Sequence, residues 1–182
     1  MERVYAAVGV TRFAAWVPEW DGAMCADLDR RGYRLDERTR AMGMGLADLA
    51  VPVPDLELAP PDWAEYLRVI EVPADLLAGA DHDAFHVLLA RRDGENVAAA
   101  MAHDHDGDCG IYNVGTLPHA RRRGLGTALT AVHLHRARER GCRTASLQST
   151  PEAERLYAAL GFRDLGAILE FVPTDGATEG PA

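Results

Sequence analysis

The sequence predicts an α/β protein in which helices cover the faces of one mixed β-sheet. Segments of strand length and helix length follow one another in the order β-α-β-β-β-α-β-α-β. Glycine and proline mark the ends of several segments, as expected at turns and helix stops. With 182 residues, 48% of them hydrophobic, the chain can bury a core as one domain or as one domain with an appendage.

The first fifty residues predict a strand, a helix and a second extended segment. Residues 4–16 are apolar and β-prone until Pro18 stops them. Residues 21–31 predict a short helix with Asp21 as its N-cap and Gly32 as its end. Residues 33–46 predict extended chain, as one strand or a hairpin, with Met42 and Met44 on one face.

The rest of the chain predicts the main sheet. Pro52 and Pro54 make residues 51–54 a linker or the entry to a strand. Asp93-Gly94-Glu95 predicts a hairpin turn, and residues 174–182 predict a disordered tail. The expected elements are strands at 56–58, 85–91, 96–102, 110–117 and 145–148, helices at about 61–70, at 124–140 and at 151–160 with Pro151 in its first turn, and one or two strands within 162–171.

Composition and charge limit the classes of function. The formal net charge of −9 argues against a general nucleic-acid binder, which needs a broad basic face. Three widely spaced cysteines without a C-x-x-C pair indicate a reducing compartment. No apolar run approaches the roughly 20 residues of a membrane span, and the N-terminus lacks the apolar stretch of a signal peptide. We therefore expect a soluble cytoplasmic protein with no membrane partner.

The segment Arg121-Arg122-Arg123-Gly124-Leu125-Gly126-Thr127 predicts an anion site at a helix start. The first turn of a helix exposes unsatisfied N–H groups and a partial positive charge. Glycines let a phosphate approach the backbone, and arginines add donors for its oxygens. Neither a third Rossmann glycine nor a Walker Lys-Ser/Thr is present. A solvated basic helix start is the alternative interpretation.

Three motifs together resemble the GNAT superfamily of N-acetyltransferases. They are Val114-Gly115-Thr116-Leu117-Pro118, the pattern Arg121-x-x-Gly124-x-Gly126, and Leu156-Tyr157-Ala158-Ala159-Leu160-Gly161-Phe162. The resemblance covers about residues 54–173. It implies an acyltransferase fold whose central, mostly antiparallel sheet has one splayed parallel pair and flanking helices. We accordingly expect a GNAT domain over residues 51–173.

The resemblance also implies roles for particular residues. Tyr157 would protonate the departing coenzyme A thiolate, with a plain core aromatic as the alternative. Arg122 stands where the family frequently has glycine, and Thr150 where it often has asparagine. The residues implied in binding acetyl-coenzyme A as co-substrate are Val114, Gly115, Thr116, Arg121, Arg122, Arg123, Gly124, Leu125, Gly126, Thr127 and Thr150.

The implied reaction is direct transfer of an acetyl group to a primary amine of a small molecule, peptide or protein. A non-catalytic acyl-coenzyme A sensor of the same fold is the alternative. An aliphatic amine has a pKa near ~10.4 and must lose a proton before it attacks. The base stays open among Glu71, His86, His103, Tyr112 and His119. Residues 103–109, rich in His and Asp, predict a solvated hairpin turn, and we expect no metal site.

Residues 1–50 have two interpretations. An offset of 129 residues relates Gly32-Tyr33-Arg34 to Gly161-Phe162-Arg163, each at the end of a short helix. Residues 1–50 would then be a remnant GNAT-like lobe. The alternative is an ordinary N-terminal extension that packs on the sheet or mediates a homodimer.

Overall fold

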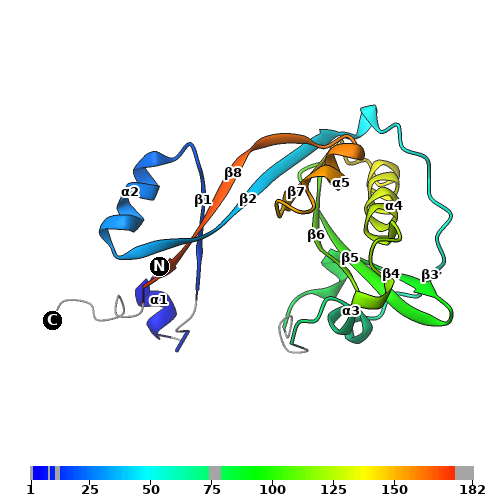
Figure 1. Ribbon diagram of the computed structural model, residues 1–182, viewed down its shortest axis with the longest axis horizontal. Coiled ribbons are helices and arrows are strands. Elements are labelled where there is room, and N and C mark those ends of the chain that lie inside the picture. The colour runs from blue at the N-terminus through cyan, green and yellow to red at the C-terminus, as the bar shows by residue number, and fades with distance from the viewer. Residues whose placement is uncertain (1, 8, 11–12, 74–78, 175–182) are drawn as a thin grey trace. The chain divides into compact units, whose positions relative to one another are not determined.

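The computed structural model describes residues 2–7, 9–10, 13–73 and 79–174 (Figure 1). Their strands form an eight-stranded mixed sheet in the order β1-β8-β2-β7-β6-β5-β4-β3. The predicted α/β class is confirmed. The chain divides into two compact units: unit 1 contains residues 1–41 and 165–182, and unit 2 contains residues 42–164. The predicted segment 1–50 contributes to both. No helix in the described ranges is long and apolar enough to cross a membrane.

Unit 1 contains helix α1 (Glu2–Ala7), strand β1 (Ala15–Pro18), helix α2 (Gly22–Arg30), and the larger parts of β2 (Tyr33–Gly45) and β8 (Arg163–Pro173). β1 pairs antiparallel with β8, from Ala15 opposite Phe171 to Pro18 opposite Ile168. Among the described residues of unit 1, four buried side chains form the core cluster: Val17, Leu28, Tyr33 and Phe171.

The predicted strand at residues 4–16 is wrong at residues 4–7, which belong to helix α1, and residues 15 and 16 lie in β1. Helix α1 contains Glu2, Ala6 and Ala7, which favour helix, and the apolar residues from 4 to 16 do not alternate strictly. The α2 prediction is confirmed, since the Asp21 side chain accepts a hydrogen bond from the Met24 N–H at 3.0 Å. β2 is one continuous strand rather than a hairpin, and Met42 and Met44 are both buried.

Unit 2 contains most of the sheet. Its strands β3 (Leu58–Ala59), β4 (Phe85–Arg92), β5 (Glu95–His105) and β6 (Asp108–Thr116) are antiparallel neighbours. β7 (Thr144–Ser149) pairs with β6 in parallel. Both predicted two-residue turns form, with positive φ at Asp93 and Gly94 (51° and 83°) and at Asp106 and Gly107 (49° and 83°).

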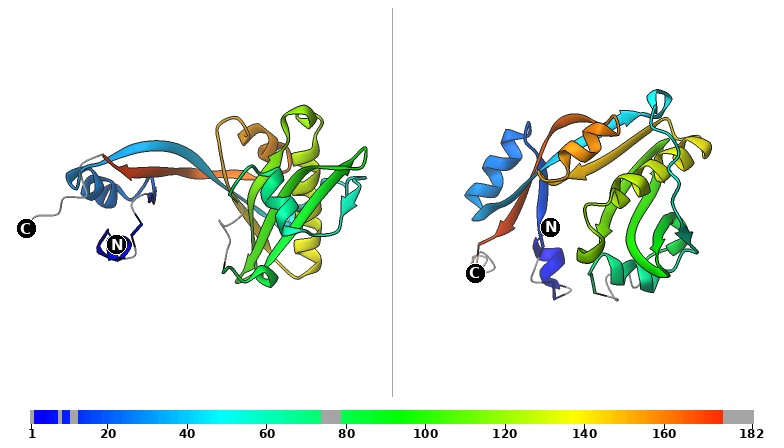
Figure 2. Two further views of the ribbon diagram at one scale, coloured as in Figure 1. Left: turned by 90° about the horizontal axis from the view of Figure 1, so that it is seen from below. Right: turned by 45° about the vertical axis from the view of Figure 1, so that its right-hand side comes forward.

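Helices α3 (Trp63–Val69) and α4 (Leu125–Glu139) cover opposite faces of this sheet (Figures 1 and 2). Successive residues of a strand point to opposite faces. Val87 and Leu89 accordingly pack in a cluster with Leu67 of α3. Leu88 and Ala90 pack in a different cluster with Leu129 of α4. Three short 3₁₀ turns complete the connections, at Leu46–Asp48, His82–Ala84 and Pro118–Ala120.

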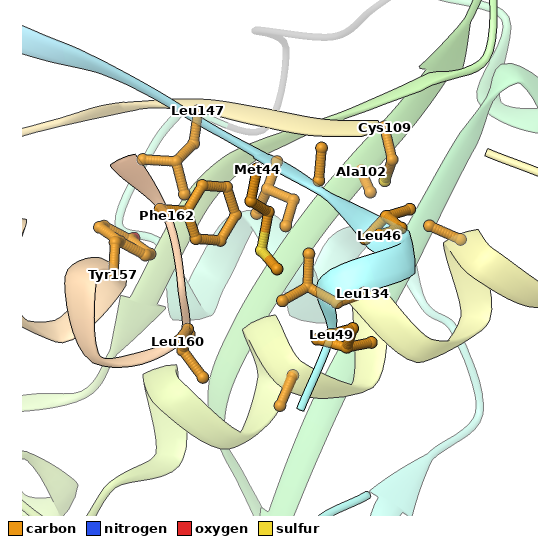
Figure 3. Packing of buried hydrophobic residues seen from close by; sticks show 14 of the residues in the cluster. Met44, Leu46, Leu49, Ala102, Cys109, Leu134, Leu147, Tyr157, Leu160 and Phe162 are labelled. Atoms are coloured by element: carbon orange, nitrogen blue, oxygen red, sulfur yellow. The ribbon is translucent and has the colours of Figure 1, made fainter. Parts of the chain in front are cut away.

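The largest cluster joins α4, helix α5 (Glu154–Ala159), β7 and the end of β2. Figure 3 shows Met44, Leu134, Leu147, Tyr157 and Phe162 pointing toward one another within it. The predicted start of α5 at Pro151 is wrong by three residues. Residues 151–153 form a turn instead, in which the Ala153 N–H donates to the Thr150 carbonyl at 3.1 Å.

The chain end departs from the predicted tail at one residue. Thr174 donates hydrogen bonds to the Gly32 carbonyl through its N–H at 3.0 Å and through its hydroxyl at 2.6 Å. Thr174 therefore continues from β8 into an ordered contact with the start of β2. The remaining residues of the predicted tail, 175–182, lie outside the described residues.

The structure extends the internal similarity from sequence to elements. At the offset of 129 residues, β1 corresponds to β7, α2 to α5 and β2 to β8. Gly32 and Gly161 both have positive φ, 78° and 103°, just after their helices. Leu28 and Tyr157 correspond and are both buried. In the strand order β1-β8-β2-β7, corresponding strands hold mirror positions about the β8–β2 pair.

Candidate active site

The parallel pair β6–β7 separates toward the carboxyl ends of its strands. Pairing runs from Asp108 opposite Thr144 to Ile111 opposite Leu147. Beyond that point β6 continues to Thr116 and β7 to Ser149 without pairing with each other. The strands therefore share hydrogen bonds at one end and leave backbone groups available at the other.

β6 carries an irregularity where it leaves β7. On its other side, Ala99 pairs with Gly115 and Met101 with Tyr112, so two residues of β6 face Ala100. Asn113 there has φ 49°, a conformation that asparagine tolerates better than most residues. This β-bulge redirects the backbone N–H groups of β6 at the predicted pantetheine-binding stretch Val114–Thr116.

The end of α3 lies directly against the bulge. A Cβ placed on Gly115 would be 3.1 Å from Ile70 Cγ2 and 3.3 Å from Ile70 Cα. Glycine suits this close approach, because an added Cβ would push Ile70 away by a few tenths of an ångström. Glu71, the next residue, has φ 59°. Glu71, one of the five candidate bases, therefore follows directly on the residue that contacts the bulge.

The segment between β6 and α4 presents a row of unpaired backbone donors. Arg122 and Gly124 both have positive φ, 58° and 76°. The first amide of α4 that donates within the helix is that of Ala128, to the Gly124 carbonyl at 2.9 Å. Within the described structure, the six N–H groups from Arg122 to Thr127 have no acceptor. Successive N–H groups in such a turn form a concave anion site, which the helix dipole strengthens.

The residues of this turn differ in their contacts. Arg121 Nε donates to the Thr116 carbonyl at 3.0 Å, which links the turn to the end of β6. Arg122 and Arg123 are exposed and make no hydrogen bond or ion pair in the described part of the chain. A Cβ on Gly124 would meet nothing within 4 Å, so this glycine is not required by packing. A Cβ added to Gly126 would lie 3.4 Å from Val114 Cγ1, which is an ordinary van der Waals contact.

Tyr157 lies on α5 in the large cluster, with 8% of its surface exposed. Its ring meets that of Phe162 edge to face, with 6.0 Å between the ring centroids. Burial raises the pKa of the Tyr157 hydroxyl. Val114 packs against the same cluster, so the bulge and Tyr157 border one apolar region. Thr150 is exposed, and its carbonyl accepts the Ser149 hydroxyl at 2.8 Å.

The other candidate bases lie apart from the bulge or point away from it. His86 Nε2 lies 3.4 Å from a carboxylate oxygen of Asp104, and His119 Nε2 lies 3.3 Å from a carboxylate oxygen of Glu95. His103 lies opposite Gly110 in the β5–β6 pair. The Tyr112 ring lies over Gly110, where an added Cβ would come within 2.8 Å of ring atoms.

Sequence reasoning missed Tyr66 beneath the bulge. Its side chain is fully buried, and burial raises the pKa of its hydroxyl although the neighbouring Asn113 side chain opposes that rise. The signal was present, because Tyr66 and Leu67 lie on the apolar face of a predicted helix. What the sequence does not reveal is that Asn113 faces this helix.

The His- and Asp-rich stretch 103–109 forms the predicted hairpin. Asp108, after the turn, accepts hydrogen bonds from the hydroxyls of Thr144 at 2.6 Å and Ser146 at 2.5 Å. These contacts hold the paired end of β6 against β7. The described residues contain no group of three or more His, Cys, Asp or Glu side chains arranged to hold a metal ion.

The fold agrees with comparisons to known proteins. Residues 51–162 match the acetyltransferase (GNAT) family. The chain therefore belongs to the GNAT family of acetyltransferases.

Particular relatives extend the comparison. Mycothiol acetyltransferase of Thermomonospora curvata is 39% identical over 80 residues, which are 42% of this chain and 27% of that protein. The match thus spans about a quarter of that relative's length. A GCN5-related N-acetyltransferase from Kribbella flavida superposes with a TM-score of 0.76 at 24% identity, over 96% of this chain and 72% of the other. A tandem GNAT protein from the clavulanic acid biosynthesis pathway superposes with a TM-score of 0.70 at 16% identity, over 100% of this chain and 68% of the other.

Proposed function

We propose that this protein binds acetyl-coenzyme A at residues 114–127 and transfers the acetyl group directly to a primary amine. The row of six free N–H groups from Arg122 to Thr127 carries the proposal. A pyrophosphate needs several donors within one small concave surface, and this turn supplies them from the backbone. The exposed guanidinium groups of Arg122 and Arg123 would add charge beside it. Thr150, exposed at the end of β7, would contact the coenzyme from the other strand.

The splayed strands suit the remainder of the donor. The pantetheine arm carries amides, and residues 114–116 offer backbone groups on the edge of β6 that no longer pairs with β7. The thioester would then lie near the bulge, where a backbone N–H can stabilise the oxyanion that forms during attack. Family membership supports this placement, and the relatives named as acetyltransferases support acyl transfer as the reaction.

Proton transfers would come from both sides of the bulge. Glu71 is the candidate base best supported by geometry, since its neighbour Ile70 contacts the bulge at Gly115. Tyr157 would donate a proton to the departing thiolate, because its raised pKa keeps the phenol protonated at neutral pH. No covalent intermediate on the protein is required. The acceptor would be an amine of a small molecule, peptide or protein.

Two wider features are proposed with the activity. The correspondence of β1, α2 and β2 with β7, α5 and β8 supports residues 1–50 as part of a second, GNAT-like lobe. In that lobe Leu28 occupies the position of Tyr157, so it would lack the acid. Three free cysteines, two of them buried, support work in a reducing compartment such as the cytoplasm.

A glycine substitution tests the coenzyme site. Gly124→Val places a β-branched side chain at φ 76° and fills the open space above the free amides. We expect acetyl-coenzyme A affinity, measured by calorimetry, to fall by at least about tenfold. Gly94→Val is the matched control, since Gly94 has φ 83°, equally open surroundings and a position in the β4–β5 turn. Equal affinities in the two variants would refute the proposed site.

Catalysis is tested separately from binding. Thiol release from acetyl-coenzyme A should appear with at least one primary amine in a panel of polyamines, amino sugars and peptides. Stable binding of the coenzyme without thiol release on any amine would favour the acyl-coenzyme A sensor instead.

A further inference from the structure

Unit 2 contains a cavity of about 330 Å³ at the end of the sheet remote from the proposed coenzyme site. Its lining comes from the start of β4, the 3₁₀ turn before it, the start of α3 and the second half of α4. His133 lies eight residues beyond Leu125, so it is roughly 12 Å along α4 from the helix start. The proposed coenzyme A function does not use this cavity.

A buried histidine without hydrogen bonds lines the cavity. The His133 side chain is fully buried, and neither ring nitrogen has a hydrogen-bond partner in the described part of the chain. Burial lowers its pKa to about 3, while the nearby Ala100 carbonyl opposes that fall. The ring is therefore neutral at physiological pH and keeps one donor and one acceptor. Buried polar atoms without partners cost free energy unless a ligand or water satisfies them.

The same face of α4 supplies positive charge. Arg136 lines the cavity, and its side chain has no hydrogen bond or ion pair in the described structure. Arg140, one turn further, is held by Asp104 through two hydrogen bonds of 2.6 and 2.8 Å. Asp104 is thereby neutralised, and Asp83 is the acidic residue that lines the cavity itself. Arg136 is the cation left available for a ligand.

The wall opposite α4 is aromatic. The rings of Trp63 and His82 stack with 4.4 Å between their centroids, and Phe85 meets Trp63 edge to face at 6.0 Å. β3 pairs with β4 only at Leu89 and Ala90, so the edge of β4 beside the cavity has no strand partner in the described chain. A planar ring fits against such a wall, and a negative group beside it would reach Arg136.

We propose that this cavity is a second binding site, for a small aromatic carboxylate. The ring would lie against Trp63 and Phe85 and the carboxylate would pair with Arg136. The His133 ring, beside the Ala100 carbonyl in this structure, would turn its N–H toward the same ligand. An unpaired arginine, an unsatisfied buried histidine and an aromatic wall meet in one cavity of ligand size, and together they select for charge and for shape.

Benzoate is the probe that tests the site, measured by calorimetry and by ligand-observed NMR without acetyl-coenzyme A. We expect saturable binding that benzamide, the uncharged analogue, does not reproduce. Arg136→Gln should weaken benzoate binding by about tenfold, the usual loss for a charge-assisted hydrogen bond. Arg138→Gln is the matched control, since Arg138 is exposed on the same helix but does not line the cavity.

A second variant and a competition complete the test. His133→Leu should also weaken benzoate binding while leaving thermal stability unchanged or higher, because it removes an unsatisfied buried polar ring. Coenzyme A should not displace benzoate. The proposal is overturned if benzoate fails to bind, if Arg136→Gln and Arg138→Gln bind it equally, or if coenzyme A competes with it. These readouts do not depend on acetyl transfer.

Discussion

At the scale of single residues, Tyr157 combines a polar group with an apolar setting. Its ring packs with Phe162 in the large cluster of unit 2, while Val114 of the bulge borders the same cluster. Burial disfavours the phenolate and so raises the pKa of the hydroxyl. A phenol in this setting keeps its proton at neutral pH and can donate a hydrogen bond or the proton to a thiolate that leaves beside it.

Tyr157→Phe removes the proposed acid and keeps the ring. We expect the rate of thiol release at saturating substrates to fall about a hundredfold, the usual contribution of general acid catalysis. Affinity for acetyl-coenzyme A should stay within about twofold, because the proposed phosphate contacts are backbone groups. Tyr33→Phe, which removes a buried phenol in unit 1, is the control and should leave the rate unchanged. Undiminished turnover in Tyr157→Phe would exclude the acid role.

At the scale of elements, the ion pair of Arg140 with Asp104 joins the end of α4 to β5. Arg140 follows the last residue of α4, and its guanidinium binds both carboxylate oxygens of Asp104 near the end of β5. The Arg140 hydrogen bonds, more than any other cause, hold the pKa of Asp104 well below its usual range. The Asp104 side chain is 26% exposed, so solvent screens this pair only in part.

Stability should therefore depend on the ionisation of Asp104. Because its folded-state pKa is depressed, the stabilisation is fully present above the unfolded value near ~3.9 and is lost as pH falls from there through the lower folded-state pKa. Asp104→Asn should lower the free energy of unfolding by about 1.5–3 kcal/mol at pH 7. In urea titrations the two proteins should converge toward pH 2.

Asp93→Asn provides the matched control. Asp93 is 93% exposed and lies 3.6 Å from Arg92, so its loss should leave stability unchanged within error. A constant difference between wild type and Asp104→Asn from pH 7 to pH 2 would show that the pair contributes through shape and not through charge.

Elements with strong local signals were predictable from the sequence. Asp21 and Asp62 cap their helices, and Asp93-Gly94 closes its hairpin, because these residues satisfy or permit the backbone locally. The start of α5 was misplaced because Pro151 suits a first helical turn and an isolated turn equally well. Helix α1 was missed because a short apolar run fits a strand or a helix.

Only part of the candidate site was predictable from the sequence. Gly124 and Gly126 indicated an anion-binding turn, because glycine and a helix start have local physical meaning. The contact of Ile70 with Gly115, and the packing of Tyr66 under Asn113, join α3 to a strand more than forty residues away. No local pattern encodes such a contact, so the choice of Glu71 over the other candidate bases required the structure.

At the scale of the whole molecule, the chain divides into two units, and the proposed chemistry belongs to one of them. The proposed coenzyme residues and Tyr157 all belong to unit 2, whereas Leu28 is one of four buried residues in the core of unit 1. Leu129 is fully buried where α4 packs on the sheet, close to the free amides.

A pair of leucine truncations tests this separation. Leu28→Ala and Leu129→Ala should each lower the free energy of unfolding by about 2–5 kcal/mol, as buried leucines do. Leu28→Ala should keep wild-type affinity for acetyl-coenzyme A at a temperature where it is folded, whereas Leu129→Ala should lose affinity with the displaced helix start. Equal losses of affinity would show that unit 1 supports the coenzyme site.

The six free amides between Arg122 and Thr127 also bear on how this chain can change over evolutionary time. Every amino acid except proline carries the same N–H, so substitutions at most of these positions leave the donors in place. Drift would be restricted by the path of the chain, through Gly124 and the left-handed turn at Arg122, and not by the chemistry of the side chains. Distant descendants of this protein could therefore look unrelated in sequence across this turn and still hold a phosphate there.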